Sequence, residues 1–151
     1  MRVERSGTIT QPIERVFEYA STPENDPTWV PASLRHQKIS PGPLRVGSIT
    51  EEEVAFLGRR MRCVWEVCHY EPPTAFTART LSAPLPATIH LLLEPLDSAT
   101  ELTLVVDAEL RGFYKLMGPL MNWVVQRQFK TQLHTLKNLL ESGTADNARA
   151  G

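Results

Sequence analysis

The sequence predicts an α+β fold, in which a curved antiparallel sheet wraps around a long C-terminal helix. From residue 34 to residue 110 the apolar residues recur with the period of β-strands, and the runs are separated by short turns. From Gly112 to Ser142 the apolar residues recur with the period of an α-helix. A long helix with a wide apolar face must bury that face, and a sheet with an apolar inner face provides the surface for it.

The first thirty residues predict one strand and a short helical connection. Residues 3–10 are expected to form the strand, and Pro12 suits the first position of a helix because it has no N–H to leave unpaired. Apolar residues follow at i, i+3, i+4 and i+7 over residues 13–20, which indicates a short amphipathic helix. Three prolines within residues 21–31 allow no more than a helical turn or a loop around Trp29.

Six further strands are expected in the middle of the chain, and proline or glycine breaks give the sheet places to bend. The short turns between them imply antiparallel pairing. In the longest strand Met61, Cys63, Trp65 and Val67 share one face. The expected strands cover residues 34–40, 48–56, 60–70, 76–81, 88–94 and 101–110.

The terminal helix is expected over residues 115–142, which would span about 42 Å if straight. Pro119 interferes with the carbonyl group of Lys115, so the helix should begin near Leu116 or kink there. The apolar row along the helix consists of Met117, Met121, Val125, Phe129, Leu133, Leu136 and Leu140, broadened by Leu116, Leu120 and Val124.

Length and composition predict one domain over residues 1–142, followed by a small, polar and flexible tail over residues 143–151. With 42% hydrophobic and 22% charged residues, the chain is neither disordered nor a charge-rich coiled coil. A net charge of −1, from 16 basic and 17 acidic residues, argues against nucleic-acid binding. No apolar run approaches the ~20 residues of a membrane helix, so no membrane insertion is expected.

The compartment expected from the sequence is the cytoplasm. The chain begins with Met1-Arg2-Val3-Glu4-Arg5 and no apolar stretch follows, which argues against a secretory signal. Cys63 and Cys68 have an odd separation on one predicted strand, so they point to opposite faces and should not form a disulfide. Free cysteines fit a reducing environment.

Several short motifs follow one another in a characteristic order. They are Ile9-x-x-Pro12-x-x-x-Val16-Phe17, Pro23-x-Asn25-x-x-x-Trp29, Val46-Gly47, Gly58, Trp65-Glu66-Val67, Tyr70-x-Pro72-Pro73, Glu94-Pro95, Leu110-x-Gly112 and Leu136-Lys137-x-Leu139-Leu140-Glu141. Over residues 1–142 this order resembles the START and birch-pollen-allergen-like helix-grip superfamily (SRPBCC), in its polyketide cyclase/dehydrase-like branch. The motifs are specific for a fold and not for a reaction.

The resemblance implies a seven-stranded antiparallel sheet, two short helices after the first strand, and a deep apolar cavity between the sheet and the C-terminal helix. It implies binding or transport of a small hydrophobic molecule, such as a lipid, polyketide, quinone or aromatic metabolite. A cyclase or dehydratase-type enzyme is the alternative, and an interaction module without a ligand is a third. No cofactor is expected, and the chain is expected to be a monomer or homodimer.

Flexible and aromatic side chains are expected to line the cavity. Methionine in particular adapts to irregular ligand surfaces. The expected lining residues include the apolar cluster at the start of the long helix and inward residues of the strands. The predicted ligand-binding residues are Trp29, Trp65, Phe76, Leu91, Leu104, Val106, Met117, Leu120, Met121 and Val124.

An enzyme would need an ionisable group in the cavity. His69 shares its parity with Trp65 and is expected to face inward at a strand end, and at least one carboxyl group of residues 51–53 is expected to face the concave side. The candidates are His69, His90, Glu51, Arg79 and Tyr114, and for the histidines and Glu51 a structural or surface role is the commoner alternative. His36 and His134 are expected to face solvent, and no metal site is expected because paired ligand spacings are lacking.

Overall fold

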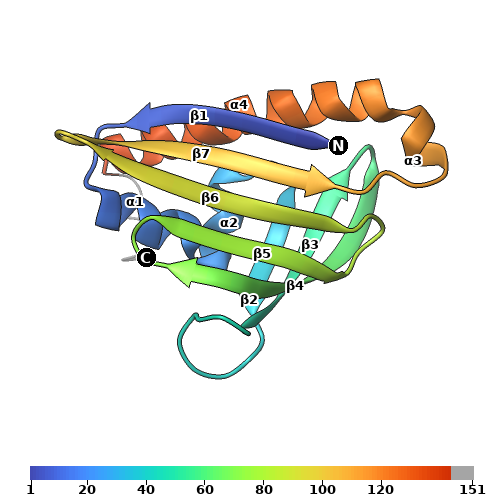
Figure 1. Ribbon diagram of the computed structural model, residues 1–151, viewed down its shortest axis with the longest axis horizontal. Coiled ribbons are helices and arrows are strands. Elements are labelled where there is room, and N and C mark those ends of the chain that lie inside the picture. Colours follow the sequence, from blue (N-terminus) through green and yellow to red (C-terminus); the bar gives the residue numbers. More distant parts are fainter. Residues whose placement is uncertain (144–151) are drawn as a thin grey trace.

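The structure is a computed structural model that describes residues 1–143, so positions 144–151 of the predicted tail lie outside the described residues. It has the predicted α+β helix-grip fold, a curled seven-stranded sheet with a long C-terminal helix (Figure 1). In chain order the elements are β1 (Arg2–Ile9), α1 (Ile13–Ser21), the 3₁₀ helix η1 (Pro23–Asn25), α2 (Asp26–Trp29), β2 (Ser33–Lys38), β3 (Ile49–Phe56), β4 (Arg59–Glu71), β5 (Ala75–Ser82), β6 (Ala87–Leu96), β7 (Ala99–Ala108), α3 (Phe113–Leu116) and α4 (Gly118–Glu141).

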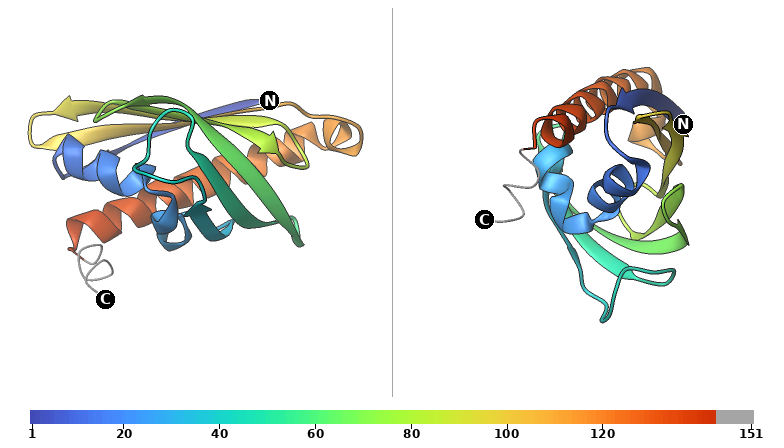
Figure 2. Two further views of the ribbon diagram at one scale, coloured as in Figure 1. Left: turned by 90° about the horizontal axis from the view of Figure 1, so that it is seen from below. Right: turned by 90° about the vertical axis from the view of Figure 1, so that its left-hand side faces the viewer.

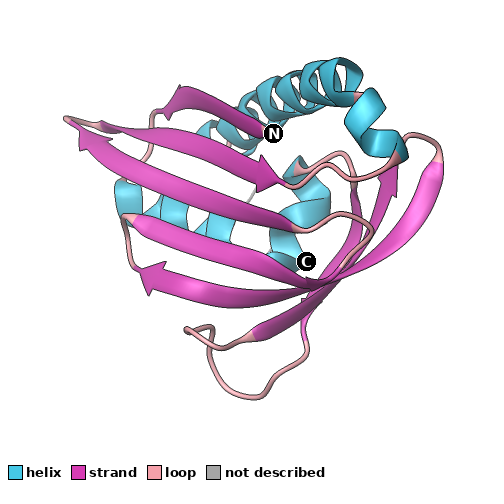
Figure 3. Ribbon diagram, turned by 45° about the vertical axis from the view of Figure 1, so that its right-hand side comes forward, coloured by secondary structure: helices cyan, strands magenta, loops and turns pink. Residues whose placement is uncertain are grey.

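All neighbouring strands are antiparallel, in the order β1-β7-β6-β5-β4-β3-β2. Strands β2 to β7 follow one another along the chain, and β1 completes the sheet beside β7. The sheet curves, so that β2 and β3 turn away from the direction of β1, and α4, α1 and α2 lie on its inner side (Figure 2). Figure 3 shows α3 at one end of the sheet, beyond the start of α4.

The apolar alternation of β7 is what joins the sheet to the helix. Leu102, Leu104 and Val106 are buried and pack in one cluster with Phe129 and Leu136 of α4. Helix α4 also crosses β1, where a Cβ atom built on Gly7 would lie 3.5 Å from the Leu133 side chain. That is an ordinary van der Waals distance, so α4 packs directly over β1 here, and an alanine would fit at this position as well.

A bulge in β4 changes which of its residues face inward. Val67 pairs with Ala78 but His69 pairs with Thr77, so Cys68 is the extra residue in the ladder. Cys63, Trp65 and Val67 are buried as predicted, but the His69 side chain is 53% exposed. The prediction that His69 faces inward is therefore wrong, since Tyr70 takes the inward position beyond the bulge.

The C-terminal helical region is divided in two. The chain forms α3 and α4 with a break at Met117, and Pro119 lies in the first turn of α4. A single straight helix over residues 115–142 is therefore not formed, and the interruption expected at Pro119 is confirmed.

Cys63 is buried, Cys68 is exposed and both are free, so the expected absence of a disulfide between them is also confirmed. Among residues 1–143 no helix has the length and apolar character needed to cross a membrane.

Candidate functional site

A cavity of about 290 Å³ lies between the concave face of the sheet, α4 and the short helices. Its walls are mainly aliphatic and aromatic side chains from almost every element of the fold. One face of α4 contributes Met121, Val125, Gln128, Phe129 and Gln132. Seven of the ten predicted ligand-binding residues line it, namely Trp29, Trp65, Phe76, Leu91, Leu104, Val106 and Met121.

The other three predicted residues, Met117, Leu120 and Val124, are not on the cavity wall. Met117 forms the break between the helices, and Leu120 is 44% exposed. On an α-helix, residues one position away from Met121 and Val125 are turned by about 100° from that face. The apolar band at the start of the helix is thus too wide for all of it to face inward.

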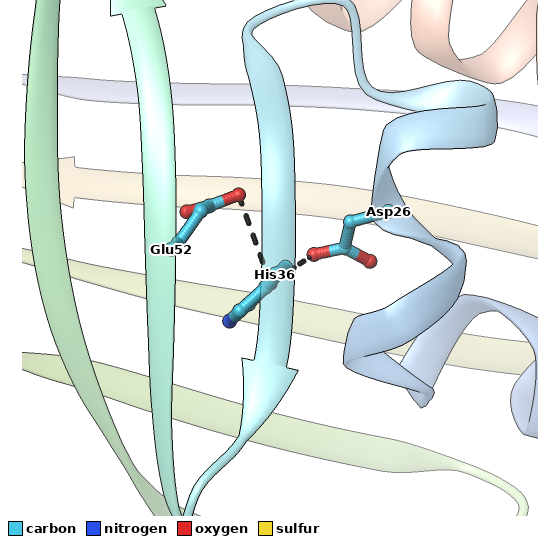
Figure 4. Close-up of side chains that lie close together, drawn as sticks. All are labelled: Asp26, His36 and Glu52. Carbon is cyan, nitrogen blue, oxygen red and sulfur yellow. Dashed lines mark hydrogen bonds and ion pairs between the residues drawn. The ribbon is translucent and has the colours of Figure 1, made fainter.

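Three ionisable side chains come together in this mainly apolar wall, and Figure 4 shows them as Asp26, His36 and Glu52. We call them the polar cluster. Nδ1 of His36 lies 2.7 Å from Oδ2 of Asp26 and 3.7 Å from Oε2 of Glu52. Nε2 of His36 lies 2.7 Å from Oγ1 of Thr50, and Nε1 of Trp65 donates to Oε1 of Glu52 at 3.1 Å.

Strand register places the members of the polar cluster. His36 of β2 is the direct cross-strand partner of Glu52 of β3, which is in turn the partner of Cys63 of β4. Directly opposed residues of an antiparallel pair have their side chains on the same face. Asp26 is the first residue of α2. Its side chain reaches His36 and Glu52 because η1 and α2 pack against β2.

Burial and charge together determine the protonation of this cluster. Burial raises the pKa of Asp26 to about 6, although the hydrogen bond and charge of His36 oppose that rise. Burial alone would lower the pKa of His36, but the hydrogen bond to Asp26 and the nearby carboxyl charges outweigh it, so this pKa is raised. The pKa of the neighbouring Cys63 thiol is raised to about 11, mainly by burial and to a smaller extent by the charge of Glu52.

Residues 1–141 match the family model described as "Polyketide cyclase / dehydrase and lipid transport". The chain belongs to this family. No curated protein matches the chain at a significant level.

Solved structures share the fold of this family member at low sequence identity. TTHA0849 from Thermus thermophilus aligns with a TM-score of 0.82 at 16% identity, covering 95% of this chain and 99% of that one. The ZhuI aromatase/cyclase from Streptomyces sp. R1128 aligns with a TM-score of 0.77 at 18% identity, covering 93% of each chain. A START superfamily protein from Mycobacterium smegmatis aligns with a TM-score of 0.78 at 16% identity, covering 93% of this chain and 97% of that one.

Of the five predicted catalytic candidates in this polyketide cyclase/dehydrase-like chain, only Tyr114 lines the cavity. Arg79 is exposed and donates two hydrogen bonds to Glu66. His90 is half-buried away from the cavity wall, with Nδ1 3.0 Å from Oγ1 of Thr77. His69 is exposed beside Glu71.

Glu51 is also outside the cavity, because it faces away from the concave side and pairs with Arg62 at 2.7 Å. The carboxyl group that faces inward is Glu52, the residue of opposite parity. The hairpin turn carries a signal that could have identified it. A two-residue turn at Leu57-Gly58 pairs Phe56 with Arg59, and counting back along both strands places Glu52 opposite the inward Cys63.

His36 and Asp26 are functional candidates that sequence reasoning missed, and His36 was expected to face solvent. Its side chain is only 11% exposed and contacts Asp26 and Thr50. His134 is exposed on α4 as expected, 3.2 Å from the Asn138 amide. The alternation of β2 gives no signal for His36, because that strand contains no regular apolar pattern.

The polar cluster also has the chemistry of a cation site. The ligand atoms of Asp26, His36 and Glu52 lie within 4.8 Å of one another, and two carboxylates with one imidazole suit ions such as Zn²⁺. The Nδ1 atom that would bind the ion is instead at hydrogen-bond distance from Asp26. In this arrangement a hydrogen bond joins His36 to Asp26 through that atom.

Proposed function

We propose that this chain binds or carries a small hydrophobic molecule in the cavity between the sheet and α4. The observation that carries the proposal is an apolar cavity of about 290 Å³ with a single ionisable cluster in the wall formed by the described residues. Small-molecule sites are typically about 300–1,000 Å³, mostly apolar, with few polar groups that fix orientation. A cavity at the small end of that range suits an aromatic metabolite or a short acyl chain.

The polar cluster favours a ligand that carries a hydrogen-bond donor. Oε1 of Glu52 accepts from Trp65, but Oε2 of Glu52 lies 3.7 Å from His36 Nδ1, whose hydrogen bond goes to Asp26. A carboxyl oxygen with spare acceptor capacity is thus present in the cavity wall. A ligand hydroxyl or amine can donate to it, whereas a ligand carboxylate would meet two carboxyl groups.

The test compares naphthalene derivatives of one shape by calorimetry. We expect 2-naphthol to bind about tenfold or more tightly than 2-methoxynaphthalene, because a hydrogen bond to a charged group contributes that much. We expect 2-naphthoate to bind most weakly. In Glu52→Gln the advantage of naphthol should shrink. An equal affinity for naphthol and methoxynaphthalene would remove the proposed role of Glu52.

A cavity-filling variant tests the location of the ligand. Ala78→Met puts three more heavy atoms into the cavity from β5, and Ala75→Met makes the same change on the same strand at a position that does not line the cavity. We expect the first variant to abolish binding and the second to retain it. Retention of naphthol binding by Ala78→Met would show that the ligand lies elsewhere. If none of the probes binds and no apolar molecule co-purifies with the protein, the proposed function itself is contradicted.

A cyclase or dehydratase-type reaction is the second candidate, and the Asp26–His36 pair is the observation that favours it. A histidine held between carboxyl groups in a cavity wall can transfer protons to and from a bound carbonyl compound. The experiment offers a linear poly-β-ketone thioester and follows the absorbance of aromatic products. Turnover that His36→Gln removes while naphthol binding persists would support catalysis, and no turnover by the wild-type chain would contradict it.

The third expectation, an interaction module with a filled interior, is the weakest of the three proposals. A cavity of about 290 Å³ is large enough for a guest molecule and speaks against a solid interior.

A further inference from the structure

Large apolar side chains are exposed on α3 and on the first turns of α4. Phe113 is 68% exposed, Leu116 84%, Leu120 44% and Trp123 58%. We call these four residues the α3–α4 surface. Isolated exposed apolar residues are normal on protein surfaces, but four large ones within eleven residues of the chain are not. The core does not use these side chains, so they are available for contact with a partner.

The same segment has a one-sided charge. Residues 110–140 contain Arg111, Lys115, Arg127, Lys130 and Lys137 and no acidic residue, although the whole chain has a net charge of −1. Arg111 pairs with Glu109 and Lys137 pairs with Glu141. Lys115, Arg127 and Lys130 have no carboxylate partner among residues 1–143.

One of these cations is next to the apolar group. The guanidinium of Arg127 lies 5.4 Å from the centre of the Trp123 ring. Lys115 lies within α3, between Phe113 and Leu116. Tryptophan, phenylalanine and leucine together with basic residues are the composition of segments that lie in a membrane interface.

The cavity opens at this end of the molecule. Lining residues from the β3–β4 hairpin, the β5–β6 loop and α3 remain at least partly exposed, such as Phe56, Pro84 and Tyr114. Among the lining residues from α1, η1 and α2, Ala20, Ser21, Pro23 and Trp29 are buried, and the Asp26 side chain is 18% exposed. Figures 1 and 2 show the hairpin, the loop and α3 at the same end of the sheet.

We propose that the α3–α4 surface docks on an anionic lipid surface, with the cavity opening turned toward the lipid. Charge decides between this partner and a second copy of the chain. A two-fold symmetric dimer would bring the basic patch of one copy against that of the other, whereas anionic headgroups complement it. Docking of this kind needs no membrane-spanning helix, and it does not depend on which ligand the cavity holds.

The experiment is flotation of the full chain with vesicles. We expect binding to vesicles of 70% phosphatidylcholine and 30% phosphatidylglycerol, weak binding to pure phosphatidylcholine, and release by 0.5 M NaCl. The fluorescence of Trp123, the exposed tryptophan, should shift to the blue on binding. Lys115→Glu with Arg127→Glu should lower the partition coefficient by about tenfold or more, since each charge near the surface contributes about a factor of five.

Leu116→Ser with Trp123→Ser tests the apolar part and should also weaken binding. The controls are Arg35→Glu on β2 and Leu96→Ser at the end of β6 (Figure 1), exposed residues away from the α3–α4 surface, which should leave binding unchanged. Circular dichroism checks that each variant folds. Failure of the wild-type chain to float with anionic vesicles, or equal loss in the control variants, would overturn the proposal. So would a wild-type dimer in sedimentation that Leu116→Ser with Trp123→Ser converts to a monomer.

Discussion

The imidazole ring of His36 is held at both nitrogens, with Nδ1 2.7 Å from Oδ2 of Asp26 and Nε2 2.7 Å from Oγ1 of Thr50. The side chains of His36 and Asp26 are only 11% and 18% exposed. Two contacts fix the plane of the ring, so the orientation of His36 is a property of the fold. The ring needs no ligand to adopt it.

The stability of the protein should fall as the pH rises across the titrations of this pair. The folded pKa of Asp26 is about 6 against an ordinary value of 3.8, and the pKa of His36 is raised above 6.5. The folded state therefore binds protons more tightly, so the contribution of Asp26 is lost between about pH 4 and 6 and that of His36 above 6.5. Urea unfolding from pH 4 to 9 measures this.

The control for that prediction is Asp26→Asn with His36→Gln, which removes both titrating groups. We expect its free energy of unfolding to vary less steeply with pH than that of the wild-type chain. Identical slopes for the two proteins would show that other groups cause the pH dependence.

The two cysteines should differ strongly in reactivity. Cys68 is exposed, whereas Cys63 is buried with a pKa raised to about 11, and the thiolate is the reactive form. We expect one fast and one slow thiol in the reaction with a disulfide reagent at pH 8. Cys68→Ser should remove the fast phase and Cys63→Ser the slow one. Two phases of equal rate would contradict the buried position of Cys63.

Leu136→Ala should lower the free energy of unfolding by about 2–5 kcal/mol, because it leaves a cavity in the core. Leu136 is fully buried between α4 and the sheet. Leu116→Ala, the same change at an exposed position, should alter stability by no more than about 0.5 kcal/mol. Chemical denaturation compares them, and similar losses would mean that Leu116 is packed in solution.

Trp65→Phe should also be destabilising, by about 1–3 kcal/mol, because it removes a donor from a buried carboxyl group. In the Glu52→Gln background the same substitution should cost less. A double-mutant cycle by denaturation measures the coupling, and additive effects would contradict the Trp65–Glu52 hydrogen bond.

Periodicity was sufficient for the fold, because burial repeats along each element. Leu102, Leu104 and Val106 of β7 are buried at alternate positions, with Val105 the one buried exception of opposite parity, and this strand could be predicted from its pattern. The position of Pro119 predicted the interruption of the terminal helix. Both are local features, so they can be predicted from the sequence alone.

The polar cluster could be predicted only in part, because it depends on contacts between elements. Asp26 and His36 are ten residues apart on a helix and an edge strand, and no local pattern states that these two pack together. Which carboxyl group faces inward depends on the register of the β3–β4 hairpin. Without the length of the turn, the sequence does not decide between Glu51 and Glu52. For His69 the bulge at Cys68 overturned a parity that was otherwise regular.

The bulge at Cys68 also gives β4 one place where its length can change without inverting the strand. Loss of Cys68 would leave His69 alone between Val67 and Tyr70, and the ladder to β5 would become continuous from Trp65 to Glu71. Tyr70 would keep its place beside the rings of Phe17 and Phe76, whose centres lie 5.7 Å and 6.4 Å away. Loss of a residue from a regular stretch of the strand would instead exchange its inner and outer side chains. Evolution can therefore shorten this strand at the bulge while the aromatic interior survives.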